Sequence, residues 1–235
     1  MRVNTSVPTS VMICCNMRNL SHILYRDFRQ EWRQSAIWLS VVLFMVGSVY
    51  ITSLCFNAKM DKPSWNAVFW IMLLFTSLSL SVRSLNASSQ GYALYQFLLF
   101  NPIDFIIARW LFQVILALVL NLLTVLVYGW FMGFSVQRPA LFLSITVLNT
   151  LAAASVLVFT NALTSYVSAG FSLLSILSIP LLIPVYSISV KLGKQAMDGI
   201  ENAAFRWDLM GILSAVFLIS FGLLILLFPY LWRSR

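Results

Sequence analysis

Six long apolar stretches alternate with short polar connections between Ile37 and Trp232. A bilayer core about 30 Å thick requires roughly 20 apolar residues when a helix crosses it. Residues 37–46 are apolar on every side, as a lipid-embedded helix must be when its backbone hydrogen bonds are all internal. The pattern predicts an all-α integral membrane protein with six transmembrane helices, which are expected at residues 37–56, 65–82, 105–131, 140–163, 171–190 and 209–232.

The composition supports a membrane domain and leaves no room for a second domain. Hydrophobic residues make up 60% of the chain and charged residues 9%, and the mean hydropathy of +0.90 is outside the range of soluble domains. The connections between the apolar stretches are too short to hold a separate globular unit. We expect one membrane domain over residues 17–235, preceded by a flexible leader over residues 1–16, with Met17 as an alternative start of translation.

The segment before the first apolar stretch, residues 17–35, has the pattern of an amphipathic helix. Basic side chains fall on one stripe and apolar side chains cover the opposite face. Such a helix lies along the membrane interface, with its basic groups toward lipid phosphates or water. It is either a surface anchor alone or an anchor that also binds a partner. The basic stripe is His22, Arg26, Arg29 and Arg33, and the apolar face is Leu20, Ile23, Leu24, Phe28 and Trp32.

Asp27 and Glu31 do not fit a simple lipid anchor. Both fall within the apolar arc of this predicted helix, four residues apart, and neither has a basic partner three or four positions further on. Carboxylates in that arc are badly placed against lipid. Basic groups on another segment or subunit are one explanation, and two solvated acids at the rim of the helix are the other.

The connection over residues 83–104 starts polar and becomes an apolar, aromatic segment that is too short to span. Its last part, residues 92–100, is predicted to form a short interfacial helix. Asn101, Pro102 and Asp104 then give a strong helix start, with Asn as N-cap, Pro at the first position and an acid near the positive helix terminus.

Two of the predicted spans carry features beyond compatibility with lipid. The fifth span contains Pro180 and Pro184, and each proline removes one helical hydrogen bond, so a kink is predicted. The pair is either a hinge or a packing feature, and Ser178 and Ser187 lie near enough for local hydroxyl compensation. The fourth span contains polar residues that either hydrogen-bond to other helices or line a substrate path. These residues are Asn149, Thr150, Ser155, Thr160 and Asn161.

The net charge of +8 comes from basic residues whose positions indicate the orientation of the chain in the membrane and not a nucleic-acid site. Arginines crowd the segment from Arg18 to Arg33, next to the first span, where a cytoplasmic excess of basic residues has most force. With six spans, both termini are then cytoplasmic. The connections at residues 57–64, 132–139 and 191–208 are expected to lie outside.

The predicted spans contain few of the ionisable side chains that proton transfer, metal binding or catalysis at membrane depth requires. Arg109 is the one charged residue within them, whereas ion-coupled transporters place several ionisable groups there. Gly193-Lys194 lacks the earlier glycine and the following Ser or Thr of a phosphate-binding loop. His22, the single histidine, is read as an interfacial basic residue, with haem ligation as the alternative. We expect no enzyme active site, no metal site and no directly bound cofactor, and a driving force that comes from elsewhere.

Three segments together have the character of one membrane protein family. Residues 28–33 form an acidic-basic helix before the first span. Residues 95–109 contain a Leu-rich turn, a proline and then a span that starts with Ala-Arg, and residues 173–184 hold two prolines four apart. Over residues 17–232 the chain resembles the haem exporter protein B family, the CcmB permeases of cytochrome c maturation. One departure is that residues 86–91 lack the acids that the family often has before the Leu-rich turn.

The resemblance implies a fold like that of ABC-2-type permeases and a role as the permease subunit of an ABC-type complex in the bacterial cytoplasmic (inner) membrane. It implies a separate CcmA-like ATPase that binds ATP, a second permease copy, further cytochrome c maturation membrane subunits and a haem chaperone, with haem as the handled or transported ligand. The ATPase is expected to dock on residues 17–35 and 86–100. Its candidate contacts are Asp27, Glu31, Arg33, Tyr95, Phe97 and Asn101.

Two other functions fit the residues less specifically. One is an ABC-2-type export permease for a lipid, polysaccharide or drug, since related permeases share the first two segments of the resemblance. The other is a membrane assembly scaffold that transports nothing. A neighbouring gene for a haem chaperone or a second haem-handling membrane protein would favour cytochrome c maturation over the export permease. A co-purifying ATPase would argue against the scaffold.

Overall fold

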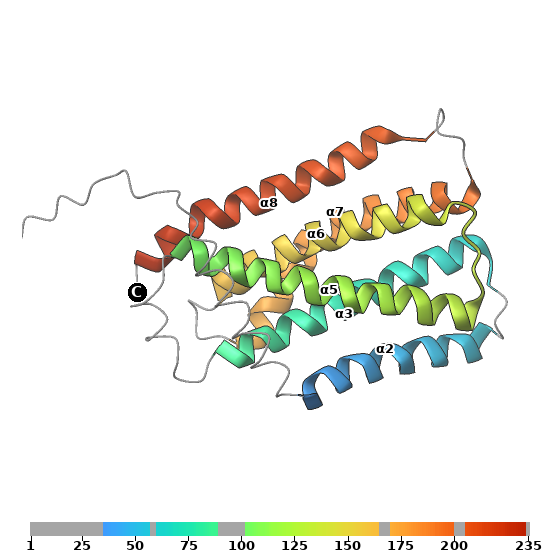
Figure 1. Cartoon of the computed structure of the whole chain (residues 1–235), viewed down its shortest axis with the longest axis horizontal. Helices are drawn as coiled ribbons and strands as arrows, with labels where there is room; N and C mark the ends of the chain where they lie inside the picture. Colours follow the sequence, from blue (N-terminus) through green and yellow to red (C-terminus); the bar gives the residue numbers. More distant parts are fainter. Residues whose placement is uncertain (1–34, 57–59, 89–101, 165–169, 200–204, 234–235) are drawn as a thin grey trace, which may run out of the picture.

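The computed structural model describes residues 35–56, 60–88, 102–164, 170–199 and 205–233. These residues form six α-helices joined by short connections (Figure 1). Each helix is long and apolar enough to cross a membrane, which confirms the predicted six-span, all-α architecture. The helices are α2 (Ser35–Phe56), α3 (Lys62–Ser88), α5 (Pro102–Met132), α6 (Pro139–Thr164), α7 (Gly170–Asp198) and α8 (Trp207–Arg233).

The largest difference from the predicted spans is at the end of α7. The predicted outer connection over residues 191–208 is wrong in its first part, because α7 continues to Asp198. Lys191 and Lys194 are exposed, whereas Leu192 and Ala196 in the same turns are buried, so these last turns are an amphipathic helix. Hydropathy falls at the two lysines, but the helix continues because its apolar side has a packing partner.

The helices form a bundle with α6 in the middle and α2 and α8 at opposite edges (Figure 1). Helix α6 packs against α3, α5, α7 and α8, and 67% of its most apolar window is buried within the chain. The corresponding share is 17% for both α2 and α8, which therefore present most of their apolar surface outward. Helix α2 packs on α3 and α5, and α8 packs on α5, α6 and α7.

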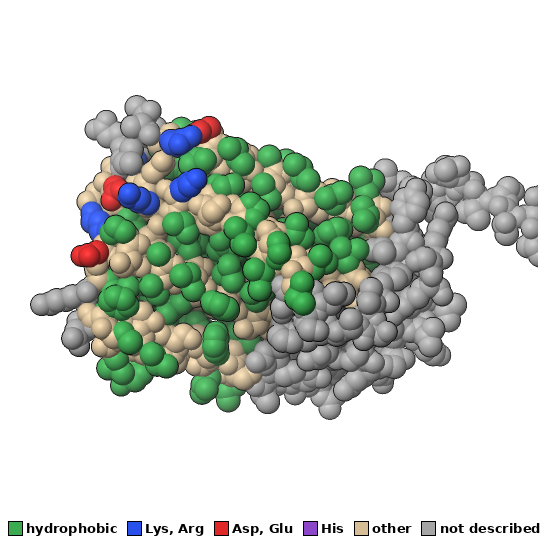
Figure 2. Space-filling model, turned by 180° about the vertical axis from the view of Figure 1, so that it is seen from behind, with side chains coloured by type: hydrophobic (Ala, Val, Ile, Leu, Met, Phe, Trp, Pro, Cys, Tyr) green, Lys and Arg blue, Asp and Glu red, His purple; other side chains and the backbone are tan. Residues whose placement is uncertain are grey.

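The two ends of the bundle differ. At the end where α2, α5 and α7 finish, the described connections are short, and we call it the short-loop end. At the opposite end, which we call the terminal end, α2 begins and α8 finishes. On the face shown in Figure 2, the charged side chains gather at the short-loop end, and the rest of the described surface is apolar or uncharged. Trp130, near the short-loop end of α5, is 88% exposed, as is typical of an aromatic residue at a membrane–water interface.

An aromatic cluster fills the core near the short-loop end, where α3, α5, α6 and α7 meet. Its rings pack edge to face or offset, with the Trp65 and Tyr128 centroids 4.8 Å apart and those of Phe69 and Phe142 5.0 Å apart. Aromatic pairs of this geometry contribute about 0.5–1.5 kcal/mol beyond their buried area. The cluster therefore makes this half of the bundle tightly packed. Its members are Trp65, Phe69, Trp70, Tyr128, Phe142 and Tyr186.

Candidate functional site

The predicted ATPase contacts lie outside the described residues. This applies to Asp27, Glu31, Arg33, Tyr95, Phe97 and Asn101, and equally to His22 and the predicted interfacial helix at 92–100. They therefore remain predictions. The start of α5 at Pro102 agrees with the helix start predicted from its N-terminal sequence.

Both prolines of the predicted hinge lie inside α7, which continues as a helix through them. Pro180 and Pro184 are exposed, on the same outward-facing stripe as Ile176 and Ile183. Because proline has no N–H, the carbonyls of Ile176 and Pro180 lose their usual helical donors. The interruption in the hydrogen-bond ladder of α7 thus lies on the exposed side of the helix.

The nearby hydroxyls do not compensate for these two lost donors, contrary to the expectation from the sequence. Ser187 Oγ donates to the carbonyl of Pro184, at 2.9 Å, which is not one of the carbonyls that the prolines leave without a donor. Ser178 Oγ is buried and has no hydrogen-bond partner in the described part of the chain. The two carbonyls that the prolines leave without a helical donor therefore receive no hydrogen bond from Ser178 or Ser187.

Beyond the prolines, α7 is fastened to α3 and α6 by side-chain hydrogen bonds. The Tyr186 and Ser77 hydroxyls lie 3.2 Å apart, and Ser189 Oγ donates to Asn149 Oδ1 at 2.9 Å. Asn66 Nδ2 donates to the carbonyl of Val190 at 2.8 Å. These three contacts follow Pro184 in the chain, so they hold the part of α7 that leads to the short-loop end.

Gly193 lets α7 approach α3 closely at this point. A Cβ atom there would lie 2.5 Å from Asn66 Oδ1 and 2.6 Å from Trp70 Nε1. Those two atoms already form a hydrogen bond of 2.9 Å, in which the indole N–H donates to the amide oxygen. Asn66 thus uses both ends of its amide, one toward Trp70 and one toward α7. We call Asn66, Trp70 and Gly193 the α3–α7 clamp.

Three of the five polar residues predicted in the fourth span hydrogen-bond to other helices. Asn149 Oδ1 accepts from Ser189 on α7, and Thr150 Oγ1 accepts from Asn121 Nδ2 on α5 at 2.7 Å. Asn161 Nδ2 donates to Ser81 Oγ on α3 at 2.8 Å. The two others, Ser155 and Thr160, donate to carbonyls of α6 itself.

These bonds favour the interpretation of the polar residues as links between helices over that of a substrate path. All five side chains are buried, at 5% exposure or less. We call Asn149, Thr150 and Asn161 with their partners the polar seam of α6. The seam runs along the central helix and joins it to three neighbours.

The chain also matches a known family. The family model described as CcmB protein matches residues 18–229, which include all but the ends of the chain. This chain belongs to the CcmB family. No curated protein matches it. Membership of the CcmB family implies a role in haem export for cytochrome c maturation, in a system with other subunits, and agrees with the resemblance seen in the sequence.

Sequence reasoning missed most of the residues that pair across the bundle of this CcmB-family chain. Asn121 lies in the middle of a long apolar run, and Asn66 is the second residue of the predicted span 65–82. Gly193 was considered only as part of a rejected phosphate-binding loop. An amide inside an apolar span was the available signal, because a buried amide in lipid requires a partner.

The described charged groups of this CcmB-family chain lie mostly near helix ends. Asp104, in the first turn of α5, is 4% exposed, and its Oδ2 atom has no partner within the described residues. At the short-loop end, Arg206 forms an exposed ion pair with Asp208 at 2.8 Å, and this contact raises the pKa of Arg206. Within the described parts, no group of three His, Cys, Asp or Glu side chains is arranged to hold a metal ion.

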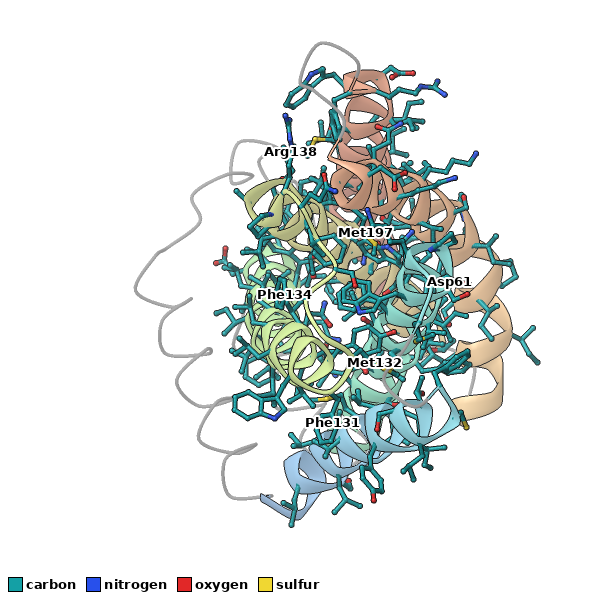
Figure 3. All side chains as sticks on the ribbon, turned by 90° about the vertical axis from the view of Figure 1, so that its right-hand side faces the viewer. Asp61, Phe131, Met132, Phe134, Arg138 and Met197 are labelled. Carbon is teal, nitrogen blue, oxygen red and sulfur yellow. The ribbon has the colours of Figure 1, made fainter. Side chains whose placement is uncertain are left out.

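The short-loop end brings together residues from four parts of the chain. In Figure 3, Asp61, Met132, Arg138 and Met197 lie around this end of the bundle. The backbone N–H of Arg138 donates to the carbonyl of Ala196 at 3.2 Å, which fixes the connection after α5 against α7. This end is therefore closed by packed side chains and by a backbone contact.

Proposed function

We propose that this chain is the permease subunit of an ABC-type complex that delivers haem for cytochrome c biogenesis, driven by a separate ATPase subunit. The observation that carries this proposal is the CcmB family match over residues 18–229. The chain itself is not the enzyme of the complex. ATP binds and is hydrolysed in the CcmA-like partner, and haem is the ligand that the complex handles.

The chemistry of the bundle interior supports an external motor. In the described helices, the polar residues of the seam are amides and hydroxyls, which keep their charge state across the physiological pH range. Asp104 is the one buried carboxylate among the described residues, and it lies in the first turn of α5, near the end of its span. Such an interior offers few ionisable groups through which a proton or sodium gradient could drive transport. Mechanical input from a partner subunit is the better match.

The proposed complex has the permease in the bacterial inner membrane with both termini in the cytoplasm. A second permease copy completes the membrane part, and other cytochrome c maturation subunits and a haem chaperone act with it. The ATPase docks on residues 17–35 and 86–100, which belong to the terminal end in sequence order. A conformational change that the ATPase causes at the terminal end is transmitted first to the polar seam of α6 and the proline pair of α7. It is transmitted afterwards to the α3–α7 clamp near the short-loop end.

A complementation experiment tests the proposal. A bacterium that lacks its own CcmB-family subunit is supplied with this chain together with its genomic neighbours, and covalent haem in c-type cytochromes is measured by haem staining. We expect staining to return, and an ATPase to co-purify with the tagged chain. A chain that is present in the membrane at normal levels but restores no covalent haem and retains no ATPase would contradict the proposal.

A further inference from the structure

One side of α7 is an exposed stripe whose chemistry changes along the helix. Its members recur every three or four residues and all of them are exposed, so they lie on the same side of α7. The stripe is apolar as far as Pro184, then has a hydroxyl at Ser187, and ends in two ammonium groups. We call it the α7 stripe, and it consists of Ile176, Pro180, Ile183, Pro184, Ser187, Lys191 and Lys194.

The apolar part of the α7 stripe is about as long as one leaflet of hydrocarbon. Eleven residues separate Ile176 from Ser187, and at 1.5 Å per residue this is about 16 Å. Half of a hydrocarbon core of about 30 Å is about 15 Å. Lys191 follows Ser187 by one helical turn. A phospholipid whose acyl chains covered Ile176 and Ile183 would therefore have its phosphate at the level of the lysines.

Lys191 and Lys194 form no ion pair with any other described residue. They lie at the short-loop end, where the basic side chains on the face shown in Figure 2 gather. Asp198, one turn beyond Lys194, is exposed but does not pair with it. Arg206 and Asp208 neutralise each other. The two lysines, three residues apart on one side of a helix, are therefore available to an anion from outside the chain, and hydrogen bonds between ionised groups are the strong ones.

The backbone that carries these two lysines is held in place by the α3–α7 clamp. The carbonyl of Val190 accepts a hydrogen bond from Asn66, and Gly193 packs so closely on Asn66 and Trp70 that a Cβ atom would not fit. Val190 precedes the first lysine and Gly193 precedes the second. The spacing of the two ammonium groups is thus largely set before a ligand binds, which lowers the entropy that binding costs.

Helix α5 has an exposed apolar stripe with a different ending. Val119, Leu122 and Leu126 follow each other at helical spacing and are exposed, and the next member of this stripe is Trp130. The last turn of α5 contains no basic residue. The stripes of α5 and α7 are therefore alike in their apolar parts and differ in charge at the level of the lipid headgroups.

We propose that the α7 stripe binds an anionic phospholipid, whose phosphate contacts Lys191 and Lys194 and whose acyl chains cover Ile176 and Ile183. An anionic headgroup fits better than a zwitterionic one, because its negative charge has no positive group of its own beside it. A second copy of the chain fits this stripe less well. A two-fold interface centred here would place the same stripe of each copy together, so that lysines would face lysines. The inference does not depend on the ATPase or on haem.

Quenching of a fluorophore on the α7 stripe tests this proposal with the full chain in lipid nanodiscs. The native cysteines are replaced by Cys14→Ser, Cys15→Ser and Cys55→Ser, and Ile183→Cys is labelled with bimane. The discs contain phosphatidylcholine with an increasing fraction of a lipid whose acyl chains are brominated, either phosphatidylglycerol or phosphatidylcholine. Brominated chains quench the label when they contact it, so the fraction needed for quenching reports which lipid occupies the stripe.

Leu122→Cys, labelled in the same way, is the matched control position. Leu122 lies eight residues before Trp130, as Ile183 lies eight residues before Lys191. We expect phosphatidylglycerol to quench the label at Ile183 at a several-fold lower mole fraction than phosphatidylcholine, and the two lipids to quench the label at Leu122 equally. High salt should weaken the preference at Ile183, because it screens the exposed lysines.

Substitution of the two lysines separates the site from the general charge of this end of the bundle. Lys191→Gln with Lys194→Gln should abolish the preference at Ile183. Lys62→Gln with Arg206→Gln removes the same charge from the same end but away from the stripe, and should leave the preference unchanged.

Two results would overturn the proposal. Equal quenching by the two lipids at Ile183 would show that the lysines do not select an anionic lipid. Quenching by neither lipid at Ile183, together with normal quenching at Leu122, would show that protein covers the α7 stripe. Neither result would affect the proposed function, which is tested by ATPase co-purification and haem attachment.

Discussion

The residues that tie the bundle together are neutral polar side chains whose partners lie far away in the sequence. Asn161 pairs with Ser81, and Asn149 pairs with Ser189. The sequence shows polar residues in an apolar span and so restricts their role to two interpretations. Choosing between them requires knowing which side chain lies opposite on another helix, and that depends on how the six helices pack. The pairs were therefore not predictable, although the need for partners was.

The α3–α7 clamp predicts the effect of adding one methyl group at Gly193. Gly193→Ala places a Cβ within 3 Å of both Asn66 and Trp70, so α7 must move away from α3 or the Asn66–Trp70 hydrogen bond must break. We expect a loss of about 1–3 kcal/mol of stability, combining overpacking with an unpaired buried donor. Thermal unfolding in detergent, followed by tryptophan fluorescence, measures it.

Gly211→Ala is the matched control for this substitution. Gly211 also lies inside a helix, α8, but a Cβ there meets nothing within 4 Å. Both variants gain the same helix propensity, about 1 kcal/mol, so their difference isolates the contact with α3. Equal unfolding temperatures for the two variants would show that the clamp has room for a methyl group.

The predicted interfacial helix gives a second prediction for a single residue. Glu31→Arg reverses a charge that has no basic partner within its own predicted helix, so it should abolish co-purification of the ATPase while the permease still inserts in the membrane. Asp198→Arg, an exposed position at the short-loop end, should leave co-purification unchanged. Retention of the ATPase by Glu31→Arg would remove Glu31 from the contact surface.

For whole helices, the sequence was sufficient to predict those features that the bilayer alone determines, namely the number and approximate position of the spans. All six spans were predicted because helix length and apolar character follow from the thickness of the hydrocarbon core. The ends were predicted less well. Helix α7 runs on to Asp198 because Leu192 and Ala196 pack inside while Lys191 and Lys194 stay exposed. A hydropathy drop marks where lipid contact ends, and a helix ends where its packing and capping end.

The proline pair gives a prediction for a whole helix. Pro180→Ala with Pro184→Ala restores two backbone hydrogen bonds to α7, and proline in a helix interior costs about 3 kcal/mol. The double variant should therefore be at least as stable as the parent chain, with near-normal protein levels. It should nevertheless lose haem-chaperone release and c-type cytochrome formation, because an uninterrupted α7 no longer bends at the proline pair.

Haem staining and a thermal melt of the same preparations separate the two interpretations of the prolines. Lower activity with higher stability is the signature of a hinge. Full cytochrome c maturation in the double alanine variant would instead identify the prolines as a packing feature.

At the scale of the whole molecule, the family and the span number were both predictable, because the matching segments and the apolar stretches are local in sequence. The orientation in the membrane remains a prediction. It rests on the arginines before the first span and on the even number of spans.

Labelling of single cysteines tests that orientation. In a background in which Cys14, Cys15 and Cys55 are replaced by serine, Lys194→Cys lies at an exposed position near the short-loop end and should react with impermeant maleimide in intact cells. Arg235→Cys, at the other end of the chain's last span, should react only after permeabilisation. Labelling of Lys194→Cys only after lysis would invert the proposed topology.

The peripheral placement of α2 and α8 has a practical consequence for purification. With 17% of their most apolar windows buried against the chain, these two helices leave most of their apolar surface for acyl chains to cover, and association of helices in lipid has no hydrophobic driving force of its own. Short-chain detergents, which cover a narrower apolar belt, should release α2 and α8 from the bundle before the aromatic cluster loosens. Extraction with long-chain detergents or into lipid nanodiscs should therefore preserve both helices, and hydrogen exchange of their backbone amides would report the difference.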